Sequence, residues 1–251
     1  MRKILIFLLL AALLCGCVQE PIPTTEPTIP VTTAPATEPT TVPTETTEVT
    51  TEPTTEPTTE PEPVYVSPLS VEDYLLPIEE YSWERQFQPE YVMVHFTSAI
   101  MTHRDDPYYL PYIRDIFVMY NVSVHYIIDR DGTIHCYVPE DRVAWHAGAG
   151  DWLEDEKYHN TMNQYAIGIE LVGMGSEEDM SIYMSGKEYR AIDDSLKCFT
   201  EAQYESLKLL VEDICQRNDI PMDRDHVIGH EEYSPTKNDP GQLFDWSRLI
   251  P

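Results

Sequence analysis

The chain has 251 residues, of which 44 are acidic and 16 basic, and its formal net charge is −28 at pH 7. We expect no nucleic-acid partner, because phosphate neutralisation needs a clustered basic face, and residues 64–251 carry only 14 lysines and arginines against 35 acids. The length allows one or two ordinary domains once segments without a core are set aside.

The first 17 residues are typical of an export signal. Arg2 and Lys3 precede an apolar run over 4–14, which is shorter than the roughly 20 residues of a membrane span. The run ends in Leu-Cys-Gly-Cys, which resembles the lipobox of bacterial lipoproteins. We therefore expect Cys17 to be acylated and to anchor the exported protein to the outer face of the bacterial cell membrane. A plain signal peptide with an incidental cysteine is the alternative.

Residues 18–67 are predicted to form a disordered spacer rich in threonine, proline and glutamate. From 18 to 63 there is no lysine, arginine or aromatic residue, and the segment holds nine glutamates and eleven of the 21 prolines. Such a composition cannot bury a core, and proline together with like-charge repulsion keeps the chain extended. The spacer would let a tethered domain sample material away from its membrane, although display of a surface adhesin is another interpretation.

Residues 68–251 are predicted to form one domain of the α/β (α+β) class. Three short apolar runs are typical of strands: 91–98, 164–173 and 226–229. Residues 122–138 hold two β-rich runs joined by Asp131 and Gly132, which predicts a hairpin.

Helical periodicity is found at about 110–120 and again at 201–217. The second helix is the clearer prediction, since Thr200 and Gln203 make a capping box before its apolar positions. The domain also holds an odd number of cysteines, and we expect them to be free and mostly buried thiols: Cys136, Cys198 and Cys215.

All eight histidines lie in this domain, and their positions select among them. His95 stands toward the end of the predicted strand 91–98, and His230 follows the strand 226–229. Ligands converge at strand ends above a sheet. His226 and His230 cannot share one metal ion, because four strand residues separate their side chains by about 13 Å and a zinc–nitrogen bond is about 2 Å.

Asp239 offers a third ligand on the turn Asn-Asp-Pro-Gly. Two histidines and one carboxylate, with a fourth position for water, are the composition of a hydrolytic zinc site. Glu170 is an acid in an otherwise apolar strand, which marks it as a candidate base. Lys237 is a nearby candidate donor to an oxyanion. An acidic surface loop that happens to contain histidine is the alternative at this point.

Four motifs, spread in order over about 91–248, resemble the zinc-dependent N-acetylmuramoyl-L-alanine amidases. They are YVMVHFTS, VHYIIDRDGTIHCYVPEDRVAWHAG, NQYAIGIELVG and VIGHEEYSPTKNDPGQLFDW. That family shares its fold with phage lysozyme-type amidases and peptidoglycan recognition proteins. The resemblance therefore implies a central mixed β-sheet flanked by helices, with a zinc-bearing groove that binds peptidoglycan.

The resemblance also assigns roles to single residues. It implies three zinc ligands, namely His95, His230 and Asp239. It implies two catalytic residues, the acid Glu170 and the transition-state-stabilising Lys237. It places three further residues in the substrate groove: Trp145, His146 and Asn163.

The activity implied is hydrolysis of the amide bond between N-acetylmuramic acid and L-alanine by a zinc-activated water, in cell-wall turnover or remodelling. Peptidoglycan or muropeptides would be the partners, and we expect a monomer.

Two features depart from the family: Val124 stands where the phage and recognition-protein branch has tyrosine, and residues 173–199 are longer than in compact members. A non-catalytic zinc-containing peptidoglycan-binding module is the alternative, although such modules usually lose a ligand or the catalytic acid.

Overall fold

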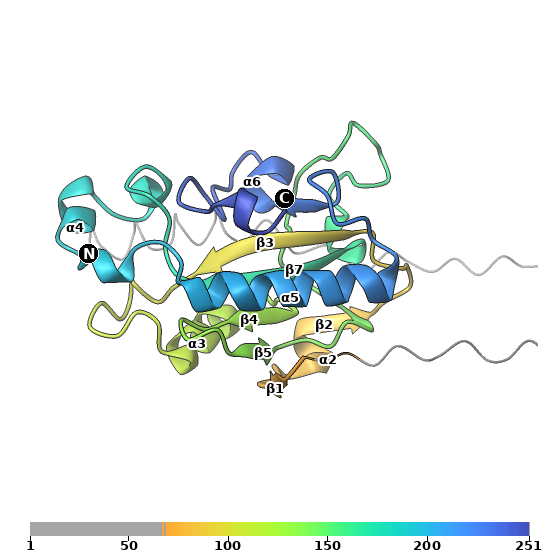
Figure 1. Ribbon diagram of the computed structural model, residues 1–251, viewed down its shortest axis with the longest axis horizontal. Helices are drawn as coiled ribbons and strands as arrows, with labels where there is room; N and C mark the ends of the chain where they lie inside the picture. The colour runs from red at the N-terminus through yellow and green to blue at the C-terminus, as the bar shows by residue number, and fades with distance from the viewer. Residues whose placement is uncertain (1–66, 68, 251) are drawn as a thin grey trace, which may run out of the picture. The chain divides into compact units, whose positions relative to one another are not determined.

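A six-stranded mixed sheet forms the centre of the computed structural model, which describes residue 67 and residues 69–250 (Figure 1). The predicted signal peptide at 1–17 with Cys17, and the predicted spacer up to residue 66, lie outside the described residues. Over the described part of the chain, no helix is both long enough and apolar enough to cross a membrane.

The strand order combines segments that are distant in the sequence. It is β1 (Val71–Asp73), β5 (Ile134–Cys136), β4 (Tyr126–Ile128), β7 (Ala166–Val172), β3 (Tyr91–Thr97) and β8 (Val227–Gly229). Strand β5 is antiparallel to β4, and the other neighbouring pairs are parallel. The expected fold class, a central mixed sheet flanked by helices, is confirmed. The three predicted apolar runs are β3, β7 and β8, each within two residues of its expected bounds.

The predicted hairpin joins β4 to β5. Gly132 adopts a φ of +90°, and a side chain there would also meet the Ala202 carbonyl oxygen at 2.8 Å, so glycine is required twice over. The paired strands are shorter than the predicted runs over 122–138, because the residues before β4 bond elsewhere. The N–H of Ser123, for example, donates to the Trp145 carbonyl at 3.1 Å.

A second, two-stranded sheet lies in the first half of the domain and was not predicted. It pairs β2 (Ser82–Glu84) with β6 (Arg142–Ala144) in antiparallel register, next to the short helix α2 (Ile78–Tyr81). Both strands have only three residues, so neither shows enough alternation to be recognised in the sequence.

Helix α5 (Glu201–Asn218) covers one face of the central sheet. It begins at the predicted capping box, in which Thr200 and Gln203 each accept the other's backbone N–H. Its apolar stripe includes Leu207 and Ile214, which pack with strand residues such as Val94 in the largest buried cluster.

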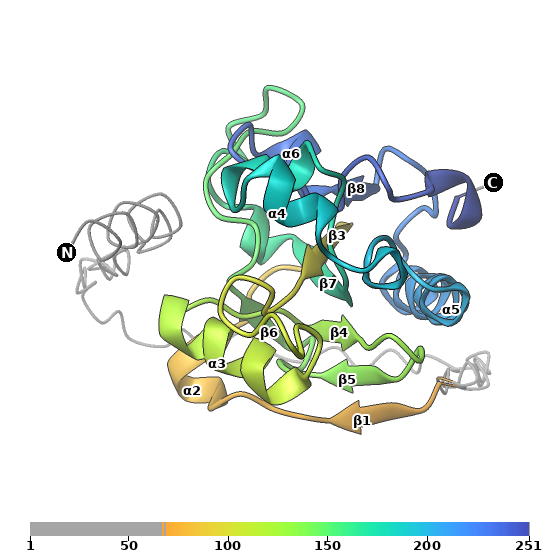
Figure 2. The same ribbon diagram turned by 90° about the vertical axis from the view of Figure 1, so that its left-hand side faces the viewer.

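Helix α3 (Leu110–Tyr120) packs on the opposite face, as the two views agree (Figure 2). The other helical elements are short: Met162–Gln164, Asp179–Ile182 (η2), α4 (Gly186–Arg190), Asp194–Leu196, α6 (His230–Tyr233) and Trp246–Arg248. Cys136, Cys198 and Cys215 are free thiols as expected, and Cys198 is exposed whereas the other two are buried.

Candidate active site

Strand alternation sends two of the predicted site residues to the same face of the sheet. Val92 and Val94 point into the core under α5, so the side chain of His95 projects from the opposite face. Glu170 of β7 is the direct register partner of His95 in the parallel pair. An imidazole and a carboxylate therefore stand side by side near the carboxyl ends of β3 and β7.

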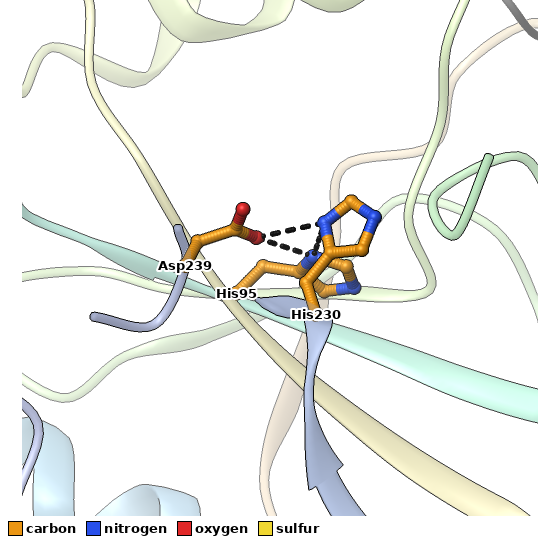
Figure 3. A group of neighbouring side chains, drawn as sticks. All are labelled: His95, His230 and Asp239. Atoms are coloured by element: carbon orange, nitrogen blue, oxygen red, sulfur yellow. Dashed lines mark hydrogen bonds and ion pairs between the residues drawn. The ribbon is translucent and has the colours of Figure 1, made fainter. Parts of the chain in front are cut away.

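His230 and Asp239 complete a cluster with His95. His230 is the first residue of α6, directly after β8, and β8 runs parallel to β3. Nδ1 of His95 lies 3.0 Å from Nδ1 of His230 and 2.8 Å from Oδ2 of Asp239. Nδ1 of His230 lies 3.0 Å from the same Oδ2. Figure 3 shows the three side chains directed at one common point.

Neighbouring groups fix the orientation of both imidazoles. Nε2 of His230 lies 2.8 Å from the carbonyl oxygen of Ala147, so this nitrogen carries the proton and donates it. Nε2 of His95 lies 3.0 Å from Nδ1 of His146, and in the tautomer in which His95 is the donor of this contact its Nδ1 carries a lone pair. Two imidazole lone pairs and a carboxylate oxygen then face one another, and only a proton or a cation between them can offset their repulsion.

The charge states of these groups suit a divalent metal. Burial and the charge of His230 lower the pKa of His95 to about 4, so this imidazole is neutral at pH 7. Burial alone would raise the pKa of Asp239, but interactions with His230 and His95 hold it well below its usual range, so the group is ionised. A neutral imidazole and a carboxylate are the forms that bind metals.

The donor set and its spacing fit zinc. The donor atoms of His95, His230 and Asp239 all lie within 4.8 Å of one another, and their closest approaches are 2.8 to 3.0 Å. Bonds of 2.0 to 2.1 Å in a tetrahedron would separate such atoms by about 3.3 Å. A small opening of the cluster is therefore enough to admit the ion.

Glu170 stands beside this cluster with a strongly perturbed carboxyl group. One of its oxygens, Oε2, is buried and has no hydrogen-bond partner among the described residues. Burial raises the pKa of Glu170 well above its usual value, and the charge of Asp239 raises it further, whereas Lys237 opposes the shift. A carboxyl group with a raised pKa holds a proton more readily than an ordinary one, which suits a group that accepts and returns a proton.

A cavity of about 320 Å³ opens beside the cluster. Its walls come from α3, from the loops that follow β3 and β6, and from the 173–199 segment. Glu170 and Lys237 line this cavity, as do Trp145 and His146. Four of the residues predicted to be catalytic or to line the substrate groove therefore line the same cavity.

Asn163 is not among the residues that line the cavity. Its side-chain oxygen accepts the backbone N–H groups of His146 and Ala147 at 2.9 and 2.7 Å. Asn163 therefore supports the loop that carries His146, and its contact with substrate stays a prediction.

The contact between His146 and His95 was not predicted from the sequence, although the glycine at position 168 indicates that another group packs closely against β7. A Cβ atom at Gly168 would lie 2.6 to 2.8 Å from the ring of His146, so β7 needs glycine where this imidazole packs over the strand. A glycine inside a strand often marks such a close approach.

His226 lies outside the cluster, in agreement with the argument that only one histidine of the pair can belong to a site. Its Nδ1 is 2.7 Å from Oδ1 of Asp223, and its ring stacks on Tyr91. These contacts give His226 a structural role.

Comparisons with known proteins agree with this geometry. The profile of the N-acetylmuramoyl-L-alanine amidase family matches residues 85–242. The 1,6-anhydro-N-acetylmuramyl-L-alanine amidase AmpD of Haemophilus influenzae is 35% identical over 146 residues, which are 58% of this chain and 65% of that protein. The N-acetylmuramoyl-L-alanine amidase AmiD of Escherichia coli is 32% identical over 136 residues, which are 51% of this chain and 43% of that protein. The crystal structure of a selenomethionine AmpD derivative superimposes with a TM-score of 0.50 at 27% identity, covering 74% of this chain and 97% of that one.

Proposed function

The chain belongs to the N-acetylmuramoyl-L-alanine amidase family, and we propose that it hydrolyses the amide bond between N-acetylmuramic acid and L-alanine in peptidoglycan or muropeptides. The match covers less than two thirds of the Haemophilus relative. One observation carries the proposal. The donor atoms of His95, His230 and Asp239 converge within 4.8 Å in a cavity that Glu170 and Lys237 also line.

Zinc is the cofactor we propose, held by His95, His230 and Asp239. When bound, it supplies the Lewis acidity that lowers the pKa of a water molecule and polarises a carbonyl group. The protonation states described above support this choice, since a neutral imidazole and an ionised carboxylate are already present.

The remaining chemistry falls to two side chains. Glu170 takes a proton from the attacking water as the new C–O bond forms at the lactyl carbonyl. It returns the proton to the L-alanine nitrogen as the C–N bond breaks, so the released peptide has a free amine. The ammonium of Lys237 donates to the oxyanion that develops on the carbonyl oxygen.

Metal removal and restoration test this function. After dialysis against a chelator, the protein is expected to release no peptide from purified peptidoglycan, and addition of one equivalent of zinc is expected to restore release. Bound zinc measured by elemental analysis should then amount to one ion per chain. Peptide release that persists in the fully chelated protein would contradict the metal's role.

A non-catalytic peptidoglycan-binding module is the second candidate function. The feature that separates the two is Glu170, because a module that only binds has no use for a buried carboxyl with a raised pKa. Stoichiometric zinc together with retention on peptidoglycan, but without any released peptide, would favour the module.

We also propose that the protein is exported and anchored through a lipid on Cys17. The support is the Leu-Cys-Gly-Cys sequence after the short apolar run. A Cys17→Ser variant is expected to move from the membrane fraction to the medium, with Cys15→Ser as the matched control that stays in the membrane. Unchanged fractionation of the Cys17 variant would count against acylation.

A further inference from the structure

A buried carboxylate lies on the 173–199 segment, outside the residues assigned to the reaction. It belongs to Asp179, the first residue of η2, and this residue is only 5% exposed. Burial of an ionisable group is costly unless it is compensated. Here Oδ2 of Asp179 accepts the backbone N–H of Ser176 at 2.8 Å and that of Gln242 at 3.0 Å.

Asp179 contacts the chain on both sides of the proposed ligand Asp239. Gln242, three residues after it, donates its N–H to the Asp179 carboxylate. Asn238, one residue before it, donates from Nδ2 to the backbone oxygen of Asp179 at 2.7 Å. The turn that presents the ligand is therefore tied to η2 at each end.

The turn and η2 pack closely around Asp179. Gly241 has a φ of +77°, and a Cβ atom there would lie 2.6 Å from Oδ2 of Asp179. A Cβ atom at Gly175 would lie 2.6 Å from the Cβ of Asp179. Two glycines from separate segments thus enclose one carboxylate.

The same segment also forms a wall of the cavity beside the metal cluster. Met180 and Tyr183 line that cavity, and Met180 is held in a buried cluster with Ile100 and Met184. The segment is therefore anchored in its own small core, so it can serve as a fixed support for the turn.

We propose that Asp179 is a positioning residue, which fixes the 238–242 turn so that the Asp239 carboxylate is aimed at His95 and His230 before any metal arrives. The general reason is that groups held in the binding geometry beforehand lose less entropy when the ion binds. The consequence for zinc affinity rests on the proposed function, whereas the consequence for the rigidity of the turn does not.

The test compares Asp179→Ala with Asp193→Ala in the full chain. Asp193 is a matched control, because its side chain also accepts a backbone N–H in the same segment, from Ser195 at 2.9 Å, but it is exposed and caps a different turn. In metal-free protein, hydrogen exchange of peptides that span 236–244 is expected to be faster in Asp179→Ala and unchanged in Asp193→Ala.

Zinc affinity, measured by competition with a chromogenic chelator, supplies the second readout. We expect Asp179→Ala to bind zinc about tenfold more weakly, which is the low end of the effect of groups that orient metal ligands. Asp179→Asn keeps an oxygen acceptor and the side-chain volume, so it is expected to restore most of the affinity. If Asp179→Ala does not fold, Asn238→Ala removes one of the two ties and should accelerate exchange to a smaller extent.

Native exchange rates and native zinc affinity in folded Asp179→Ala would overturn the proposal. Equal losses in Asp193→Ala would overturn it too, because the effect would then reflect general loosening of the segment. Failure of the proposed function has a different signature, namely zinc-loaded wild-type protein that releases no peptide while the exchange difference persists.

Discussion

The two faces of the central sheet bury very different side chains. Under α5 the sheet is apolar, with residues such as Val94 and Ile169 packed against Leu207. The opposite face carries His95 and Glu170 at the carboxyl ends of adjacent strands. Hydrophobic burial stabilises the fold, whereas buried ionisable groups oppose folding unless they are paired or bind a metal. Both faces hold apolar clusters, with Leu207 under α5 and Ile113 of α3 on the opposite side, but only the opposite face combines apolar burial with the residues of the site.

Glu170→Gln is expected to have the largest effect, and this effect should be on turnover and not on stability. The amide has the same shape but cannot accept the proton, so turnover on peptidoglycan should fall by about 10² to 10⁴, the usual contribution of a positioned base. Zinc content and the free energy of unfolding should not decrease. A variant with near-normal turnover would show that another group is the base.

Leu207→Ala on the α5 face is expected to have the opposite effect, namely a loss of stability without a loss of activity. Leu207 is completely buried, so its truncation is expected to cost about 2–5 kcal/mol of unfolding free energy, measured by urea denaturation. Zinc affinity and turnover per folded molecule should match the wild type. Loss of zinc in conditions where the variant remains folded would mean that the two faces are not separable.

Titration of the buried His125 is expected to make the stability of the protein depend on pH. Burial and the charge of Arg85 lower the pKa of His125 to about 3, while the unfolded chain has a value near 6.5. Between these values only the unfolded state binds this proton, so stability is complete above about pH 6.5 and declines as pH falls, by at most about 1.4 kcal/mol per pH unit.

A His125→Asn variant checks this effect in metal-free protein. Its unfolding free energy, measured from pH 7 down to pH 4, should fall less steeply than that of the wild type. The two slopes should differ by at most about 1.4 kcal/mol per pH unit, which corresponds to one proton. Parallel curves for the two proteins would contradict the buried, neutral state of His125.

The smallest expected effect compares Gly168, which lies inside β7, with Gly173, which directly follows it. Alanine at Gly168 would crowd the ring of His146 at 2.6 to 2.8 Å, whereas alanine at Gly173 would crowd the ring of Phe199 at 2.9 to 3.0 Å. Gly168→Ala is therefore expected to disturb the His146 contact with His95 and to weaken zinc binding by about tenfold. Gly173→Ala should lower stability alone, because Phe199 belongs to the core under α5. Equal zinc affinities in the two variants would remove the proposed support of His95 by His146.

The strand-borne half of the site could be predicted from the sequence because it depends on local periodicity. Alternation in β3 and β7 directs His95 and Glu170 away from the apolar core, and an acid within an apolar strand is conspicuous. The long helix and the hairpin were predictable for the same reason, since a capping box and an Asp-Gly turn are local signals.

The loop-borne half could not be derived from spacing. His95 and Asp239 are 144 residues apart. Their residue types suggested a shared site, but an acidic surface loop remained an alternative until the resemblance to the family was considered. The contacts of His146 with His95, and of Asp179 with the 238–242 turn, have no periodic pattern at all. They arise where separate loops meet, and only the glycines that make space for them leave a trace in the sequence.

The most direct test of the central claim is the identity of the bond that is cut. Zinc-loaded protein is incubated with a purified muropeptide, and the products are identified by mass spectrometry with labelling of new amines. The proposed function predicts a free stem peptide that begins with L-alanine and an N-acetylmuramic acid that keeps its lactyl carboxylate, and neither product should form in the Glu170→Gln variant. Cleavage within the peptide or between sugars, or an intact muropeptide in the presence of bound zinc, would contradict it.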